Sequence, residues 1–211
     1  MDGSWAILAI VGALLVGAVS PGPSLVFVVR TSLSTSTTSG AAAAFGMGVG
    51  GLLYGLVALS GLRTILQSVP QAYVAFKVLG ALYLMFLSVK IWRSARQEIV
   101  LPEEGPRAGS AVAKPFVLGL GTQLSNPKTA LVYAGTFAAF LPERPSLAML
   151  IVLPALILLV EAGWYTLVAL ACASRPSRDA YMRSKKWIDR AAGAVMGSLG
   201  VALLLRPRPA L

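Results

Sequence analysis

The chain has 211 residues, of which 56% are hydrophobic and only 12% carry a charge. Soluble domains carry about 25% charged residues, and a chain of this length could not hide so much apolar surface in a water-soluble core. The net charge is +10, but the basic residues lie in short segments between apolar runs, where they orient a membrane protein rather than bind nucleic acid. With no histidine and one cysteine, no internal disulfide, metal cluster or cofactor is expected.

Six apolar segments have the length of a membrane-spanning helix, which needs about 20 mostly apolar residues. The first is interpreted as a mature span rather than a secretory signal, because Asp2 stands where such a signal needs basic residues. The longest polar connection, residues 93–114, contains two prolines and two glycines and predicts a flexible loop. The predicted spans are Trp5–Val29, Gly40–Leu62, Tyr73–Trp92, Pro115–Leu141, Leu147–Ala173 and Trp187–Leu205.

The lysines and arginines predict how these spans are oriented. Twelve of them fall on one side of the six-span arrangement and five on the other, and the positive-inside rule places the richer side in the cytoplasm. The loop 93–114 is then cytoplasmic and both termini lie outside. We therefore predict an all-α membrane protein with a single transmembrane domain over residues 1–211, built from two inverted three-helix repeats over 1–92 and 115–211.

Two correspondences between the halves support the predicted repeats. The third span contains Gly80 followed by Ala81 three residues after a lysine, and the sixth contains Gly193 followed by Ala194 three residues after an arginine. The first and fourth spans are both interrupted by proline motifs. Matching interruptions in two halves indicate the binding site of a transporter. The alternative, that glycine and proline are simply common in membrane helices, stays open.

The interruption in the first span combines two prolines with a glycine. Prolines remove backbone donors and clash with the preceding turn, whereas glycine adopts backbone angles that are closed to other residues. At membrane depth the freed backbone groups need partners from protein or from a wet cavity, and short polar side chains stand at both interruptions. The candidate site residues here are Ser20, Pro21, Gly22, Pro23, Ser24, Asn126 and Pro127.

One cation and one anion stand out within the predicted spans. Lys128 lies about 13 residues into the fourth span, where a lysine costs roughly 2.5–3.5 kcal/mol. It either stretches to the interface or serves a polar cavity. Glu161 is interpreted as the only carboxylate inside a span, and such an acid is a candidate proton carrier or counter-ion. A structural ion pair that merely neutralises Lys128 is the alternative.

The second span is rich in glycine. Three of its glycines match the G-x-G-x-x-G pattern of dinucleotide sites by letter, but no strand precedes them, so that reading is rejected. The small-xxx-small spacing of Gly46 with Gly50 and of Gly51 with Gly55 instead predicts close contacts between helices. A contact between two subunits of a homodimer is a second possible use of these glycines, which stays open. The candidate packing residues are Gly46, Gly50, Gly51, Gly55, Gly80 and Gly193.

With these motifs in place, nearly the whole chain resembles the lysine-exporter family, which includes the homoserine and threonine exporters. The resemblance implies six helices in a bacterial plasma (inner) membrane and export of amino acids or close derivatives, driven by the proton-motive force. Ser24 stands where family members often have asparagine, which leaves the substrate open. The resemblance rests on Ser20–Pro23, Gly40–Gly50, Ser125–Lys128, Glu161 with Trp164 and Tyr165, and Trp187–Gly193, so Tyr165 joins the candidate site.

These residues suggest a mechanism of proton antiport. An amino acid would lie between the halves, with its carboxylate held by half-helix amides and Lys128 and its ammonium facing Glu161. A single acid favours neutral over dibasic substrates. Two alternatives are efflux of an inorganic cation, against which the scarcity of carboxylates and histidines argues, and a scaffold or sensor that transports nothing. An enzyme is not expected, because no histidine and no pair of acids lies within the spans.

Overall fold

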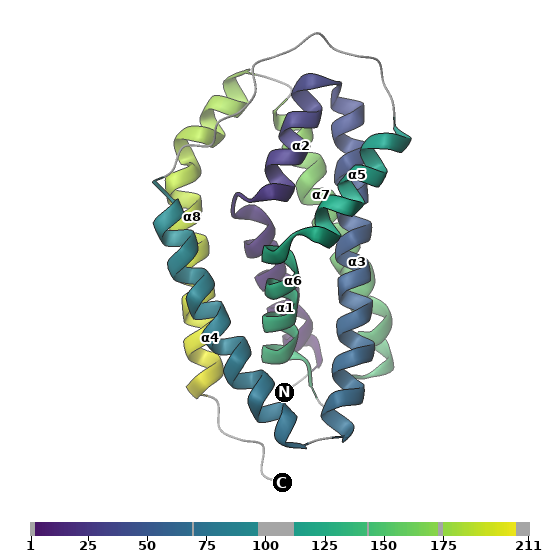
Figure 1. Cartoon of the computed structure of the whole chain (residues 1–211), viewed down its shortest axis with the longest axis vertical. Coiled ribbons are helices and arrows are strands. Elements are labelled where there is room, and N and C mark those ends of the chain that lie inside the picture. Colours follow the sequence, from purple (N-terminus) through teal and green to yellow (C-terminus); the bar gives the residue numbers. More distant parts are fainter. Residues whose placement is uncertain (1–2, 69, 97–111, 143, 173–174, 206–211) are drawn as a thin grey trace.

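The computed structural model describes residues 3–68, 70–96, 112–142, 144–172 and 175–205, and all regular secondary structure within these ranges is helical. α1 and α2 together run in one direction along the long axis, and α3, α4, α5 with α6, α7 and α8 then alternate in direction, so that the two broken pairs run opposite to each other (Figure 1). α1 begins and α8 ends at the same end of the molecule. The helices are α1 (Gly3–Val19), α2 (Pro23–Ser34), α3 (Thr37–Ser68), α4 (Pro70–Ser94), α5 (Ala113–Ser125), α6 (Pro127–Phe140), α7 (Leu147–Ala171) and α8 (Arg175–Leu205).

Several of these helices are long and apolar enough to cross a membrane. α3 over Thr37–Gly61 and α7 each offer 25 residues of this kind, and α1 with α2 passes the same test as one bent span. The three corresponding predicted spans are therefore supported by length and composition. The other three, Tyr73–Trp92, Pro115–Leu141 and Trp187–Leu205, stay predictions.

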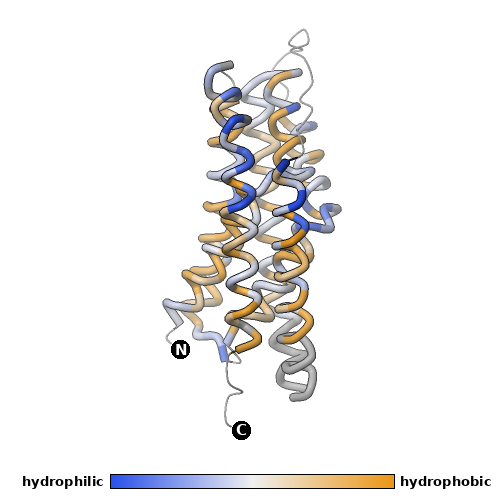
Figure 2. The backbone as a smooth tube through the Cα atoms, turned by 90° about the vertical axis from the view of Figure 1, so that its left-hand side faces the viewer, coloured by the Kyte–Doolittle hydropathy of each residue, from blue (hydrophilic) through white to orange (hydrophobic). Residues whose placement is uncertain are grey.

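The helices extend beyond the predicted spans at several of their ends, and most of all at the start of α8. α8 begins at Arg175 rather than at Trp187, because the bilayer limits the apolar stretch and not the helix itself. Its hydrophilic positions are confined to its first half (Figure 2). The predicted loop 93–114 is shortened at both ends, since α4 continues to Ser94 and α5 begins at Ala113. Residues 97–111 lie outside the described part of the chain, so the flexibility of this loop stays a prediction.

Both predicted breaks are present. α1 and α2 are bent by 56° relative to each other, and Gly22 between them is fully extended with φ −160° and ψ −173°. α5 and α6 are separated at Asn126, which is also extended. Pro23 and Pro127 each open the following helix, where the missing N–H of proline would lack an intrahelical partner in any case. Proline therefore ends one helix and starts the next.

Several contacts between the two halves occur in matching pairs, whereas those of α4 with α6 and of α1 with α8 are not matched in this way. α3 packs on α7 and α4 packs on α8. α1 contacts α7 as α5 contacts α3, and α2 contacts α7 as α6 contacts α3. The contact between α1 and α6 is matched by that between α5 and α2. Each half thus places a broken pair of helices against a long helix of the other half.

The glycines of α3 bring its neighbours close on two sides. A Cβ on Gly46 would meet the carbonyl oxygen of Phe116, and one on Gly50 would lie 2.8 Å from the Cβ of Gln123, so this face packs on α5. A Cβ on Gly55 would lie 2.7 Å from Ile157 on α7. Gly51, on the same side, approaches both α6 and α7. Both glycine faces are covered within one chain, so they are not free to form the predicted homodimer, which stays untested.

The remaining two predicted packing glycines join α4 to its neighbours. A Cβ on Gly80 would lie 3.3 Å from that of Ala138 on α6. A Cβ on Gly193 would lie 3.1 Å from the carbonyl oxygen of Ser88, and the Ser88 hydroxyl donates to the Gly193 carbonyl at 2.6 Å. Gly193 therefore joins the predicted sixth span to the third, whereas Gly80 joins the third span to the fourth.

Replacing Gly46 by alanine tests the packing of α3 on α5. The added Cβ would meet backbone atoms, the carbonyl oxygen of Phe116 and, at 2.9 Å, the nitrogen of Leu120. We expect Gly46→Ala to lower the free energy of unfolding by about 1–3 kcal/mol. Gly61→Ala on the same helix meets nothing within 4 Å and should raise it by up to about 1 kcal/mol, because alanine favours helix. Thermal unfolding in detergent measures both, and equal midpoints would contradict this packing.

Candidate functional site

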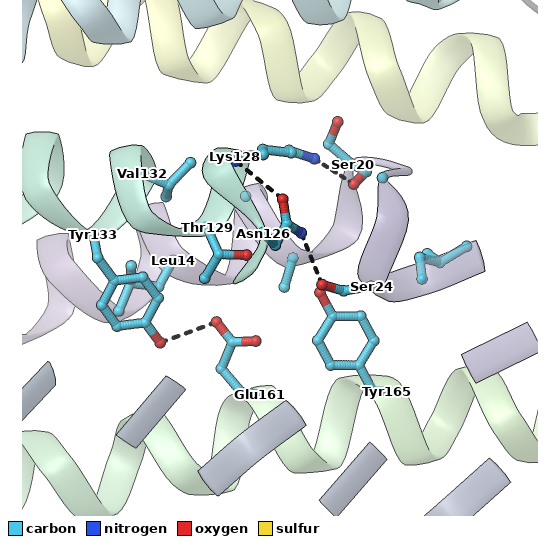
Figure 3. Close-up of a pocket in the computed structure, with 14 residues that line it drawn as sticks. Leu14, Ser20, Ser24, Asn126, Lys128, Thr129, Val132, Tyr133, Glu161 and Tyr165 are labelled. Carbon is cyan, nitrogen blue, oxygen red and sulfur yellow. Dashed lines mark hydrogen bonds between the residues drawn. The ribbon is translucent and has the colours of Figure 1, made fainter. Parts of the chain in front are cut away.

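Side chains from both breaks meet in one hydrogen-bonded group. Asn126 Nδ2 donates to Ser24 Oγ at 2.8 Å (Figure 3), and Ser24 Oγ donates to Gln123 Oε1 at 2.7 Å. All three residues are at most 4% exposed. Ser24 lies in the first turn of α2, Gln123 in the last turn of α5, and Asn126 caps α6. The two breaks are thus joined directly, without solvent between them.

Lys128 lies across the first break. Its backbone N–H donates to Asn126 Oδ1 at 3.0 Å, and its ammonium donates to the carbonyl oxygen of Ser20 at 2.6 Å. A Cβ on Gly22 would come within 3.3 Å of the Lys128 side chain, so glycine here lets the lysine approach the backbone. The ammonium therefore binds a carbonyl that the broken helix leaves free.

Glu161 is buried on the other side of this group, at 3% exposure. Its Oε1 accepts from the hydroxyl of Tyr133 and its Oε2 from Nε2 of Gln123, each at 3.1 Å (Figure 3 shows the first). Both partners are neutral. Lys128 and Glu161, which are both described, form no ion pair with each other, so the alternative of a neutralising pair does not hold in this conformation.

Two cavities adjoin the site, one on each side of Lys128. The smaller has a volume of about 20 Å³ and lies between the breaks and α7, beside Glu161. It has room for about one water molecule. The larger has a volume of about 280 Å³ and lies between the breaks and α4. Both are lined by Ser20, Gly22, Asn126 and Lys128.

All ten site residues predicted from the sequence line one or both of these cavities. Pro21, Pro23 and Pro127 line only the larger one. The expectation that a substrate ammonium faces Glu161 directly does not fit this conformation, because the space beside Glu161 is too small for an amino acid. The residues on the smaller cavity are Ser20, Gly22, Ser24, Asn126, Lys128, Glu161 and Tyr165.

Sequence reasoning missed the two neutral partners of Glu161. Gln123 lies one turn before Asn126 and is a long amide inside an apolar span, which could have suggested a buried hydrogen-bonding role. Tyr133 gives no such signal, because tyrosine is common in membrane spans. Its hydroxyl reaches Glu161 only because Gly51 leaves space for it, a Cβ there lying 2.7 Å from the hydroxyl oxygen.

A second buried carboxylate corrects the view that Glu161 is alone. Asp189 is the third residue of the predicted sixth span and is 1% exposed. Its Oδ2 accepts from the ammonium of Lys185 at 2.8 Å, and its Oδ1 from the Ser20 hydroxyl at 3.4 Å. Lys185 also donates to the carbonyl of Ser94 at 3.0 Å. The i,i+4 spacing of Lys185 and Asp189 was the available signal.

Broken helices that meet at a buried polar cluster, within an apolar all-helical chain, define a membrane transporter. The chain belongs to the LysE type translocator family, which matches residues 15–206. The resemblance found in its sequence motifs is thus confirmed.

Several similar proteins have been named for their transport. A threonine efflux protein of Salmonella typhimurium is 31% identical over 192 residues, which cover 90% of this chain and 93% of the relative. Its counterpart in Escherichia coli K12 is 29% identical over the same shares. A leucine efflux protein of Klebsiella pneumoniae is 27% identical over 93% of this chain and 91% of its own length. No solved structure matches the chain.

Removing the amide of Gln123 tests how firmly this cluster is held. Gln123→Met keeps the volume but removes the amide donor of a Glu161 oxygen and the amide oxygen to which the Ser24 hydroxyl donates. We expect the free energy of unfolding to fall by about 1–3 kcal/mol. The neighbouring Thr122→Val removes only a bond to its own helix and should change it by less than about 0.5 kcal/mol. Thermal unfolding compares the two, and an unchanged midpoint for Gln123→Met would refute the bridging role.

Proposed function

We propose that this translocator exports neutral amino acids or close derivatives from the cytoplasm in exchange for protons. The observation that carries the proposal is the position of Lys128, whose ammonium binds a free carbonyl of a broken helix between two cavities. The names of the relatives, threonine and leucine efflux proteins, favour amino acids over an inorganic cation, and transport over a scaffold role. Both named amino acids have neutral side chains.

We further propose that the chain crosses a bacterial inner membrane six times, as two inverted repeats. Counting each broken pair as one crossing gives six passes, with α1 starting and α8 ending at the same end (Figure 1). The matching contacts of the two halves support the repeats. The distribution of lysine and arginine favours a cytoplasmic location for the end at which α4 stops and α5 starts, with both termini outside.

In this proposal Lys128 binds the carboxylate of the substrate. Its present partner is one neutral carbonyl oxygen, that of Ser20. A carboxylate is a stronger partner for an ammonium than a carbonyl, because the hydrogen bond is charge-assisted. α2 and α6 both begin at the larger cavity, which is lined by Pro23 and Pro127. Helix N-termini attract negative charge. A substrate carboxylate can therefore replace the Ser20 carbonyl and free the first break.

Glu161 is proposed to carry the proton. An ionised carboxylate only accepts hydrogen bonds, and here it accepts one from Tyr133 and one from Gln123. A protonated carboxyl has one bond to donate, and in this proposal the Gln123 amide accepts it by turning its oxygen toward Glu161. That oxygen currently accepts from Ser24, which also binds Asn126. Protonation of Glu161 would thus loosen the link that joins the two breaks.

The variants Lys128→Met and Glu161→Gln test this division of roles in vesicles loaded with labelled threonine or leucine. Lys128→Met should lower both pH-driven efflux and exchange of labelled for unlabelled substrate by about tenfold or more. Glu161→Gln keeps the shape but cannot take up a proton, so it should lose the pH-driven efflux to a similar degree and retain exchange.

Lys186→Met provides the control, since Lys186 is exposed and lines neither cavity. Correctly inserted Lys128→Met and Glu161→Gln proteins that transport at the wild-type rate would refute the mechanism. A wild-type protein that moves none of a panel of amino acids would refute the function itself.

The proposed orientation can be tested with single cysteines in a Cys172→Ser background. Leu147, at the start of α7, and Val112, just before α5, are both exposed. We expect Leu147→Cys to react with a membrane-impermeant maleimide added to intact inner-membrane spheroplasts, and Val112→Cys to react only after permeabilisation. The reverse pattern would invert the proposed topology, and reaction at both sites from outside would exclude it.

A further inference from the structure

The two cavities beside Lys128 differ in what they can contain. The smaller one, at about 20 Å³, has room for about one water molecule. An amino acid needs several times that volume. The larger cavity, at about 280 Å³, has the required size. If the proposed function holds, the substrate therefore lies on the α4 side of Lys128 and the proton site lies on the α7 side.

One face of α4 forms the outer wall of the larger cavity. Its lining residues recur at intervals of three and four, the spacing of one helix face. The rings of Tyr83 and Phe86 lie with their centroids 6.1 Å apart and offer apolar surface, while Lys90 brings a charge one turn further along. The α4 residues on the cavity are Tyr83, Phe86, Leu87, Lys90, Ile91 and Ser94.

The charges around this cavity are of one sign. Lys128 and Lys90 both line it, and no carboxylate is among its lining residues, all of which lie in the described part of the chain. Glu161 lies on the other cavity, and Asp189 is already paired with Lys185. Two ammonium groups attract the carboxylate of an amino acid and repel a second ammonium on its side chain.

Resting on the proposed function, we propose that Lys90 is a specificity-determining residue of this translocator. A neutral amino acid binds in the cavity between α4 and the breaks, with its carboxylate at Lys128 and its side chain toward Tyr83 and Phe86. Lys90 then lies where the ammonium of a lysine-like side chain would reach. The translocator therefore selects its substrates by repulsion: Lys90 disfavours dibasic amino acids, and no contact is needed that favours neutral ones.

Reversing the charge at Lys90 tests this inference. We expect Lys90→Glu to raise exchange of labelled lysine relative to threonine by about tenfold or more, since about 1.4 kcal/mol of changed interaction corresponds to tenfold. Arg93→Glu is the matched control. Arg93 lies on the same helix, is exposed and does not line the cavity, and its replacement changes the count of basic residues by the same amount, so any effect on membrane orientation is shared.

The initial rate of exchange is measured for labelled threonine, leucine and lysine in vesicles that contain purified protein of verified orientation. A rise in the lysine-to-threonine ratio for Lys90→Glu, and not for Arg93→Glu, supports the inference. An unchanged ratio, or an equal change in both variants, overturns it while leaving amino-acid export intact. If Lys90→Glu cannot be purified, Lys90→Gln decides in its place, with a smaller rise in the same ratio expected and an unchanged ratio again overturning the inference.

Discussion

A backbone group inside a membrane has no water to bind, so each helix broken there needs partners from the protein. The carbonyl of Ser20, left free where α1 ends, is satisfied by the ammonium of Lys128. The same contact satisfies a lysine that would otherwise be costly at membrane depth. Two groups that are each unfavourable alone are thus stable together, and the arrangement of the site depends on this pairing.

The bond between the Lys128 ammonium and the Ser20 carbonyl joins a side chain to the backbone. It differs in this from the backbone hydrogen bonds that hold a helix together. In the proposed mechanism, Lys128 exchanges this carbonyl for a substrate carboxylate without the unwinding of a helix turn. Ser20 also donates its hydroxyl to Asp189, whose other oxygen is bound by Lys185. The two hydrogen bonds of Ser20 therefore connect Lys128 to α8 as well as to the two breaks. The buried Lys185–Asp189 pair anchors this side of the break, because both of its charges are paired and further hydrogen-bonded.

The glycines of α3 determine how close these groups can come. Gly50 makes room for Gln123, and Gly51 makes room for Glu161 and the Tyr133 hydroxyl. A larger residue at Gly50 would push α5 away from α3, and one at Gly51 would push α6 or α7 away from α3. The Gln123 amide spans a short distance between Ser24 and Glu161, so a small separation would break the chain of hydrogen bonds. The glycines of α3 therefore determine both the packing of the helices and the geometry of the site.

Much of the fold and of the candidate site could be predicted from local sequence signals. Pro21 to Pro23 and Pro127 fix the two breaks, because proline stops a helix whatever surrounds it. Lys128 and Glu161 are conspicuous in apolar segments, and both line the smaller cavity. α8 begins at Arg175, before the predicted sixth span, since a helix continues past the apolar stretch that defines a span.

The sequence by itself determined that the chain is helical and apolar, where its helices break, and which unusual residues gather at the breaks, because each of these follows from local composition and backbone geometry. Only the tertiary structure decided which groups meet. Gln123 and Tyr133 bind Glu161, Asp189 reaches Ser20, and Lys128 lies between a cavity for water and one for a larger molecule. These contacts join residues from helices far apart in the chain, and no local pattern records the distance between two packed helices.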